Sequence, residues 1–486
     1  MLGLFIYAFF MVGLGCYFTG PSRSGLGVYG LRLAVGYAAM VILLYIFEVL
    51  AGVAVREAFW FVCAISMGGL VYGLRACRWR VEWRTIARHP ASILLIAGGV
   101  AVLHNGGIGY LPVGHDEFSH WLGNPLRLNA FGDWSSAIGS LSHPGYPPGW
   151  PLLILLPWQP LAQVKLGASA AAPFVLHVAV IAFVFDLVVF VVRRRLKYGA
   201  FRSEITGWGI ILLFLAAEAL GPLWSTTLLI EPPQILGYSI FVLLLFATEI
   251  APEDERILEF SAGIVLASCY LIKAAAMLFV PAVVVLLMVR MFARGIKIDR
   301  IRGPAISLAL LTFPILILAA SWGLVSDVKG CGYSAMENFT PEAFARARGL
   351  DWADLANRYF TAVWDYISIY KTPLTIAGLV GLGSALARGA YRVPLLLVTM
   401  GACYISILYW YHLTCFGAYY FENLNSIPRF TRVLLRLLHG VGLILLVETA
   451  VAGVARLFGT SDVRGCFSAR GAGFALVLPV VLLGLW

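Results

Sequence analysis

The run AAAPFVLHVAVIAFVFDLVVFVVRRRLK, residues 170–197, is long enough to cross a bilayer as a helix, and it ends in four basic residues. A membrane-spanning helix needs about 20 consecutive apolar residues. Comparable runs recur along the whole sequence, whose 486 residues are 60% hydrophobic and only 12% charged, against roughly 25% charged in soluble domains. This composition excludes a water-soluble fold and predicts an all-α polytopic membrane protein.

Fourteen membrane spans are expected. The first has no basic stretch before it and no small-residue cleavage site after it, so we expect a retained span and not a removed signal peptide. We expect the fourteen spans to form one membrane domain. The expected spans lie near residues 2–18, 31–53, 58–76, 91–111, 170–192, 205–222, 234–250, 258–272, 274–290, 304–325, 366–386, 393–412, 434–455 and 471–486.

The basic residues predict the topology, because short basic segments between spans stay on the cytoplasmic side. Fourteen spans place every basic cluster inside and both termini outside; only the acidic turn of residues 249–255 departs from the pattern. The net charge of +10 lies in these short segments, so it indicates contact with lipid headgroups and no binding of nucleic acid. The clusters are Arg75, Arg78, Arg80, Arg84 and Arg88; Arg193, Arg194, Arg195, Lys197 and Arg202; Arg290, Arg294, Lys297, Arg300 and Arg302; and Arg388, Arg392, Arg456, Arg464 and Arg470.

Three longer segments would lie outside, at residues 112–169, 326–365 and 413–433. In the second, Asp351 can cap a helix that we expect to lie flat in the headgroup region. The apolar face of that helix would carry Trp352, Leu355, Tyr359, Phe360 and Val363. Cys331 and Cys415 are the cysteines on outside segments, and they can pair if that compartment is oxidising.

The first outside segment begins with HDEFSHWLGNPLRL, residues 115–128, in which two adjacent carboxylates stand between histidines. Neighbouring side chains on an irregular backbone diverge, so one carboxylate of Asp116 and Glu117 can face a reaction while the other holds the loop. The alternative is a set of solvated loop residues. His115, His120 and His143 are candidates for substrate binding; they lack the spacing of metal ligands, and no metal is expected.

The stretch SHPGYPPGWPLL, residues 142–153, follows in the same segment. Its prolines cannot continue a helix, and Tyr146 and Trp150 suit a membrane interface. A substrate-binding role for Tyr146 and a purely structural return into the membrane are both open.

Three charged residues interrupt apolar surroundings: Glu231 in LLIEPPQIL, Lys273 in CYLIKAAAMLF and Arg429 in NSIPRFTR. Such residues are costly near hydrocarbon and usually mark a substrate or a partner. The expected topology brings all three toward the outside face that carries Asp116. For Lys273 and Arg429 the alternative is that long basic side chains reach the interface unaided.

In this order, the motifs resemble those of the GT-C superfamily of membrane glycosyltransferases. The branch concerned contains the dolichyl-phosphate-mannose protein mannosyltransferases and the bacterial lipid A aminoarabinose and galacturonic acid transferases. The resemblance covers about residues 91–440 and rests on the pair Asp116–Glu117, the YPP segment at Tyr146, Glu231 before Pro232, the segment around Lys273, and the SIPRF motif at Arg429. It implies a catalytic transmembrane core at residues 91–440, with extra spans in 1–90 and further spans in 441–486.

The resemblance implies transfer of a sugar from a polyprenyl phosphate to an acceptor hydroxyl on a lipid or glycan, without a cofactor, at the periplasmic face of a bacterial inner membrane. Asp116 would be the general base and Glu117 would position the site, or the two roles would be exchanged. Lys273 and Arg429 would bind the donor phosphate. A secondary transporter, a lipid-linked polysaccharide polymerase or ligase, and a non-catalytic scaffold are the alternatives; no internal repeat of the transporter kind is evident.

Overall fold

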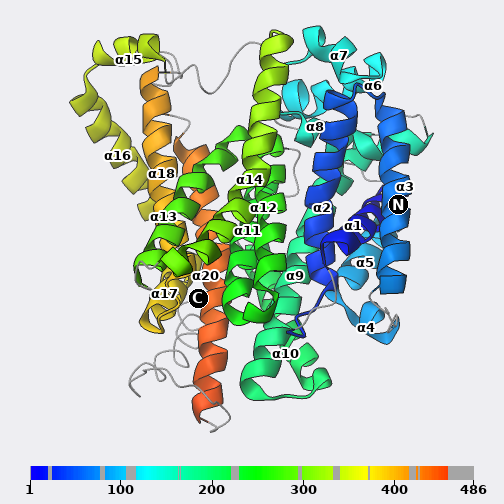
Figure 1. Cartoon of the computed structure of the whole chain (residues 1–486), viewed down its shortest axis with the longest axis vertical. Coiled ribbons are helices and arrows are strands. Elements are labelled where there is room, and N and C mark those ends of the chain that lie inside the picture. Colours follow the sequence, from blue (N-terminus) through cyan, green and yellow to red (C-terminus); the bar gives the residue numbers. More distant parts are fainter. Residues whose placement is uncertain are drawn as a thin grey trace. The chain divides into compact units, whose positions relative to one another are not determined.

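The computed structural model describes residues 2–19, 24–76, 83–104, 116–161, 164, 166–220, 229–293, 298–331, 340–369, 373–414, 423–424 and 427–457. Every regular element in these residues is a helix (Figure 1). Seven of the described helices are long and apolar enough to cross a membrane, and four shorter apolar helices accompany them. The expected all-α, multi-pass membrane fold is therefore confirmed, whereas the count of fourteen spans is not.

The helices follow the expected spans closely at most positions. They are α1 (Leu2–Phe18), α2 (Tyr29–Leu44), η1 (Tyr45–Leu50), α3 (Val55–Ala76), α4 (Trp83–Arg88), α5 (Pro90–His104), η2 (Glu117–Leu122), α6 (Gly123–Phe131), α7 (Trp134–Ala137), η3 (Ile138–Ser140), α8 (Gly149–Leu155), η4 (Leu156–Leu161), η5 (Leu166–Ala170), α9 (Ala171–Leu196), α10 (Ala200–Leu220), α11 (Glu231–Ile250), η6 (Pro252–Asp254), α12 (Glu255–Ile272), η7 (Ala274–Leu278), α13 (Phe279–Ala293), α14 (Ile298–Val328), α15 (Pro341–Arg348), α16 (Trp352–Ile369), α17 (Pro373–Ala387), α18 (Arg392–Thr414) and α20 (Ile427–Leu457).

One expected span has the wrong boundary. The span predicted at residues 366–386 begins inside α16, which runs to Ile369, and the apolar helix α17 starts only at Pro373. Proline has a fixed φ and no N–H group, so it suits the first turn of a helix and not its interior. The last expected span, residues 471–486, lies outside the described residues.

The chain divides into two compact units. The first comprises Met1–Arg194, Tyr198–Ala276 and Ala309–Cys331, and the second comprises Arg195–Lys197, Met277–Leu308 and Gly332–Trp486. The core expected at residues 91–440 therefore contributes to both units.

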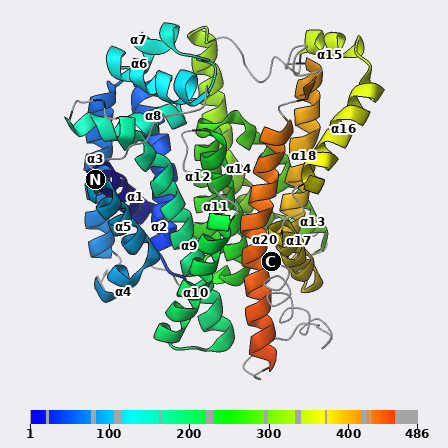
Figure 2. The same ribbon diagram turned by 180° about the vertical axis from the view of Figure 1, so that it is seen from behind.

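Burial separates inner from outer helices in the first unit. The apolar stretches of α9 and α11 are almost wholly buried, whereas α3 and the part of α14 in this unit expose many apolar side chains. Figure 2 shows these helices from the side opposite to that of Figure 1. Trp60 on α3 and Leu324 on α14 are examples, with 52% and 68% of their surface exposed. A helix that presents such residues outward suits contact with lipid tails.

Helices α1, α2 and α3 approach one another closely because glycines line their contacts. A Cβ atom at Gly36 of α2 would lie 1.7 Å from the carbonyl oxygen of Met11 in α1, and one at Gly13 would lie 2.3 Å from that of Ser66 in α3. Small residues permit such close backbone contact, and helix association within membranes depends on it.

Gly36→Ala is expected to destabilise the protein by about 1–3 kcal/mol, because the added methyl group must push α1 and α2 apart. Thermal unfolding of the purified protein in detergent measures the effect. Gly209→Ala in α10 is the control, since a Cβ there meets no atom within 4 Å and alanine favours a helix over glycine. Equal stability of Gly36→Ala and the wild type would contradict the close packing of α1 on α2.

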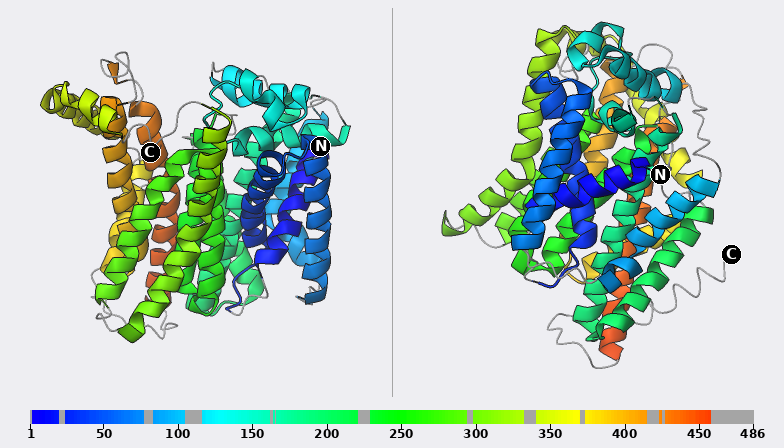
Figure 3. Two further views of the ribbon diagram at one scale, coloured as in Figure 1. Left: turned by 45° about the horizontal axis from the view of Figure 1, so that its top comes forward. Right: turned by 90° about the vertical axis from the view of Figure 1, so that its right-hand side faces the viewer.

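The first unit has two chemically different ends, joined by α2 (Figure 1, Figure 3). At one end the N–H of Gly30 donates to Asp186 near the basic end of α9. At the other, Glu48 accepts a hydrogen bond from the N–H of Trp134, in residues 116–161. We call residues 116–161 the cap segment, and the end that carries Arg88, Arg193 and Arg194 the basic end.

The acidic turn that departs from the basic pattern lies at this basic end. Arg194 donates to the carbonyl oxygen of Ile250 at 2.6 Å and pairs with Glu253 at 3.4 Å. Asp254 accepts hydrogen bonds from the N–H and the hydroxyl of Ser24. Glu253 and Asp254 thus accept hydrogen bonds from neighbouring donors, which explains why acidic residues occur at an end rich in arginine. The cap segment and this basic end lie at opposite ends of α2.

In the second unit, α16 has the expected N-cap, but part of its apolar face packs against protein. Asp351 accepts a hydrogen bond from the N–H of Asp354 at 3.0 Å, as an N-cap does. Leu355, Tyr359 and Val363 are buried, and the Tyr359 hydroxyl donates to the Ile405 carbonyl of α18. Protein covers this part of the apolar face that we expected to contact lipid, while Trp352 and Phe360 remain exposed.

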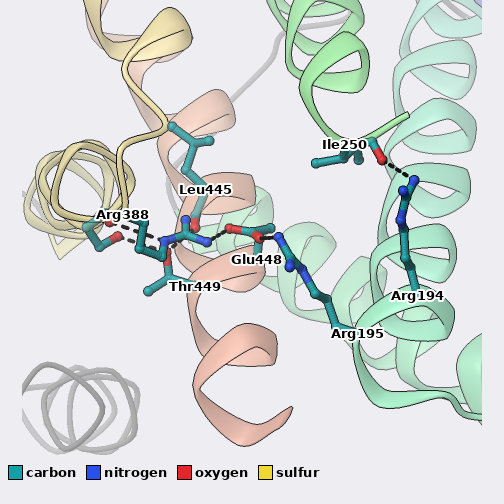
Figure 4. A network of polar contacts seen from close by, with 8 residues as sticks. Arg194, Arg195, Ile250, Arg388, Leu445, Glu448 and Thr449 are labelled. Atoms are coloured by element: carbon teal, nitrogen blue, oxygen red, sulfur yellow. Dashed lines mark hydrogen bonds and ion pairs between the residues drawn. The ribbon is translucent and has the colours of Figure 1, made fainter. Parts of the chain in front are cut away.

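A buried carboxylate joins three segments of the second unit. Glu448 of α20 is 4% exposed; it accepts from Arg388 at the end of α17 and pairs with Arg195 at 3.3 Å (Figure 4). Ser384 and Thr449 form a further hydrogen bond between α17 and α20 at 2.9 Å. Buried charges of this kind are tolerated only when they are paired.

Arg388→Met is expected to lower the stability of the protein by about 2–3 kcal/mol, because Glu448 would lose one of its two cationic partners while buried. The exposed pair Arg358–Asp354 within α16 supplies the control: Arg358→Met should cost less than about 1 kcal/mol. Unfolding in detergent measures both variants. A similar loss of stability in both variants would show that the burial of Glu448 does not strengthen its ion pair with Arg388.

Candidate active site

The cap segment is built from short helices whose ends are fixed by local bonds. Gly132, with a φ of +84°, ends α6, and Asp133 caps α7 by accepting from the N–H and the hydroxyl of Ser136. These bonds, the hydroxyl first, hold the pKa of Asp133 below its usual value. Because the folded-state pKa is depressed, the cap is intact above the usual value and weakens as the pH falls through the depressed one.

Asp116 stands where helical backbone begins, immediately before η2. Its side chain is partly buried and does not cap the helix that it starts. Element η2 is a π-helical turn, a form that is rare and frequent at functional sites. Glu117 is the first residue of η2, but its side chain lies outside the described part of the structure, as does all of His115.

Three residues expected to bind substrate come together in one cluster of rings. The rings of His120 and His143 lie 4.4 Å apart, and His143 stacks on Tyr146 at 5.3 Å. Tyr146 in turn lies parallel to Trp121, with an angle of 10° between the rings. The ring centroids of Trp121 and His120 are 6.3 Å apart, which closes the cluster. We call these four rings the ring cluster. Tyr146 is 45% exposed and Trp121 is buried, so the cluster has one open face.

Hydrogen bonds hold the ring cluster in place. Asn124 exchanges two bonds with the backbone of Ser142, at 2.8 and 2.9 Å. The next residue, His143, adopts a φ of +52°, a left-handed conformation that costs roughly 1–2 kcal/mol outside glycine. Nδ1 of His120 lies 2.6 Å from the Ser119 hydroxyl and 3.2 Å from that of Ser142. Both hydroxyl groups therefore position Nδ1 of the His120 ring.

The structure pairs two further candidates, Glu231 and Lys273. Their side chains approach to 3.7 Å between Nζ and Oε1, with 25% of the lysine and 10% of the glutamate exposed. Glu231 is in the first turn of α11, which favours a negative charge. Lys273 has an extended backbone at the end of α12, and a 3₁₀ turn follows it. The break in the helix thus presents the lysine at a partly open position beside a carboxylate.

The cap segment lies directly against this break. A Cβ atom at Gly149 would lie 2.7 Å from the carbonyl oxygen of Leu271, two residues before Lys273. Gly149 also follows Tyr146, Pro147 and Pro148 without interruption. Backbone contact therefore fixes the YPP segment and the lysine as neighbours within the first unit.

Arg429 is not among the residues that the first unit brings together. It lies in the first turn of α20, in the second unit, and is partly buried. A cation is unfavourable at the N-terminal end of a helix dipole.

Sequence reasoning missed two residues of this region. Trp121 adjoins His120 in the quoted run, but nothing in the sequence shows that it stacks on Tyr146. Glu48 of η1, which continues α2, is buried and accepts a hydrogen bond from the N–H of Trp134 at 2.8 Å. A lone acidic residue in an apolar run was the available signal. No group of three or more potential metal ligands occurs among the described residues.

Comparisons of this chain with protein-family models, with curated proteins and with solved structures found no match.

Proposed function

We propose that the chain is a membrane glycosyltransferase that moves a sugar from a polyprenyl phosphate to a hydroxyl of a lipid or glycan. The observation that carries the proposal is the Glu231–Lys273 pair at the break of α12, packed beside the segment that holds the ring cluster. A partly exposed cation beside an aromatic surface suits a ligand that has both a phosphate and a sugar ring. The resemblance of the motif order to the GT-C superfamily agrees with it.

The proposed reaction is a direct displacement at the anomeric carbon. The acceptor oxygen forms a bond to that carbon as the bond to the phosphate oxygen breaks, and the acceptor proton passes to Asp116. One base and no nucleophilic carboxylate imply inversion of the anomeric centre. Glu117 positions the acceptor or, alternatively, exchanges roles with Asp116.

The leaving phosphate gains negative charge during the reaction and requires fixed cations. Lys273 takes this role as a point charge, and Glu231 orients it from 3.7 Å. The resemblance also implies a phosphate-binding role for Arg429 of α20, because a guanidinium can hold two phosphate oxygens at once; that role remains a prediction. No cofactor is required, since the lipid phosphate is itself the leaving group.

The ring cluster is proposed to bind a sugar. Tyr146 offers an exposed aromatic face, and His143 and His120 present ring nitrogens that can bond to hydroxyl groups. His115 would extend this surface from the residue before Asp116. The proposed location is the periplasmic face of a bacterial inner membrane, where lipid-linked donors and glycan or lipid acceptors are available.

The test uses the purified full chain and a panel of polyprenyl-phosphate sugars, with binding and turnover followed by mass spectrometry of the lipids. Consumption of one donor with release of polyprenyl phosphate supports the proposal. The break in α12 is also typical of secondary transporters. If no donor is bound or consumed and a solute moves across proteoliposomes, the transporter replaces the transferase. Growth of a lipid-linked glycan by repeated addition would indicate a polymerase or ligase.

A further inference from the structure

A cavity of about 110 Å³ lies at the basic end of the first unit, at the opposite end of α2 from the cap segment. This volume far exceeds the roughly 10–15 Å³ that one water molecule needs. Its walls are formed by the residues before α2, the turn between α4 and α5, the end of α9 and the start of α10. Its charged or titratable lining residues are Arg88, His89, Asp186, Arg193 and Glu204.

On the buried wall of the cavity, hydrogen bonds hold the side chains of Asp186 and His89 in place. Asp186 is 7% exposed and accepts from the N–H of Gly30 at 2.7 Å and from His89 at 3.3 Å. His89 is 4% exposed, and its Nδ1 accepts from the N–H of Ala91, so Nε2 faces the carboxylate. The N-terminal end of α2 therefore offsets the charge of Asp186. A Cβ at Gly27 would lie 2.3 Å from this carboxylate, so glycine is required there.

The open wall carries charges that remain accessible to a ligand. Arg88 is exposed, and no carboxylate pairs with it among the residues that the structure describes. Arg193 and Glu204 form an ion pair at 3.7 Å, with 42% and 22% of their side chains exposed. Because that separation is longer than a hydrogen bond and both side chains are partly exposed, each group can also bond to a ligand. Phe185, Val189 and Phe190 of α9 supply an apolar side to the same cavity.

We infer that this cavity binds the phosphoethanolamine headgroup of a glycerophospholipid. The phosphate lies between the guanidinium groups of Arg88 and Arg193, the ammonium lies on Glu204, and the apolar side of α9 receives the start of the acyl chains. Two cations alone would suit any phosphate. The carboxylate in the same wall favours a headgroup that also carries an amine. The inference does not depend on the proposed transferase activity.

The test measures which lipids the full chain retains. The protein is reconstituted in phosphatidylcholine nanodiscs that contain phosphatidylethanolamine or phosphatidylglycerol, and native mass spectrometry counts the lipids bound after detergent extraction. The wild type is expected to retain phosphatidylethanolamine in preference to the other two. Arg88→Gln should weaken that retention about tenfold, and Glu204→Gln should remove the preference over phosphatidylglycerol.

Arg202→Gln is the matched control, because Arg202 is exposed on α10 at the same end and does not line the cavity. It should retain lipid as the wild type does. The inference is overturned if Arg88→Gln retains phosphatidylethanolamine unchanged, or if the wild type does not prefer it over phosphatidylglycerol. Protection of the wild type, but not of Arg88→Gln, by inorganic phosphate alone in a thermal unfolding assay would also overturn it, in favour of a site for a soluble anion.

Discussion

Asp116→Asn is expected to lower the turnover of a lipid-linked sugar by about 10²- to 10⁴-fold and to leave donor binding unchanged. Asparagine has the shape of aspartate but cannot accept the acceptor's proton, and general base catalysis contributes an effect of this size. The side chain is partly buried at the start of η2 and does not cap that helix, so the substitution removes no helix cap. Turnover and binding are measured separately by lipid mass spectrometry.

Asp133→Asn is the matched control for this experiment. Asp133 lies in the same cap segment, and asparagine caps a helix about as well as aspartate. The control should therefore keep full turnover. If Asp116→Asn stays active while Glu117→Gln is inactive, the base is Glu117. If both remain active, no carboxylate at the start of η2 acts as the base, and the proposed mechanism is wrong.

Lys273→Ala is expected to weaken donor binding roughly 10- to 100-fold, because a charged hydrogen bond to phosphate is lost. The same change also removes the ammonium group that lies 3.7 Å from Glu231, whose side chain is only 10% exposed. Breaking a buried ion pair destabilises a protein by up to about 3–5 kcal/mol. A drop in stability should therefore accompany the loss of binding in the single variant.

The double variant Lys273→Ala, Glu231→Gln separates these two effects. A neutral glutamine does not need the lysine, so thermal stability in detergent should return toward that of the wild type. Donor binding should stay weak if Lys273 contacts the phosphate directly. Recovery of binding together with stability would show that the lysine serves only to neutralise Glu231, and the donor site would have to be sought elsewhere.

The sequence predicted the helices well where hydrophobic runs ended in charges or at a strong breaker. The break between α12 and the apolar stretch after it was expected at Lys273, because the lysine interrupts an otherwise continuous run, and the structure places it there. The boundary between α16 and α17 was missed, since apolar residues stand on both sides of it. Pro373, the first residue of α17, marks this boundary, but the continuous hydrophobic pattern around it suggested a single span.

The contacts of the candidate site could be predicted only in part. The sequence indicated that Glu231 and Lys273 face the same side, but their pairing depends on the register of α11 against α12, which side-chain packing decides. The ring cluster depends on the left-handed backbone of His143 and on the bonds of Asn124. No pattern in the sequence specifies either feature, although three of its four rings were among the candidates.

The contact between Gly149 and Leu271 has a consequence for how sequences of this kind can diverge. Because the atoms of residue 271 that a Cβ at Gly149 would meet belong to its carbonyl group, substitution at position 271 cannot make room for a larger residue at 149. Position 271 can vary among residues that fill the same space, whereas position 149 cannot vary at all without moving the YPP segment away from Lys273. Related sequences with the same function should therefore keep glycine at position 149, while the residue at position 271 varies.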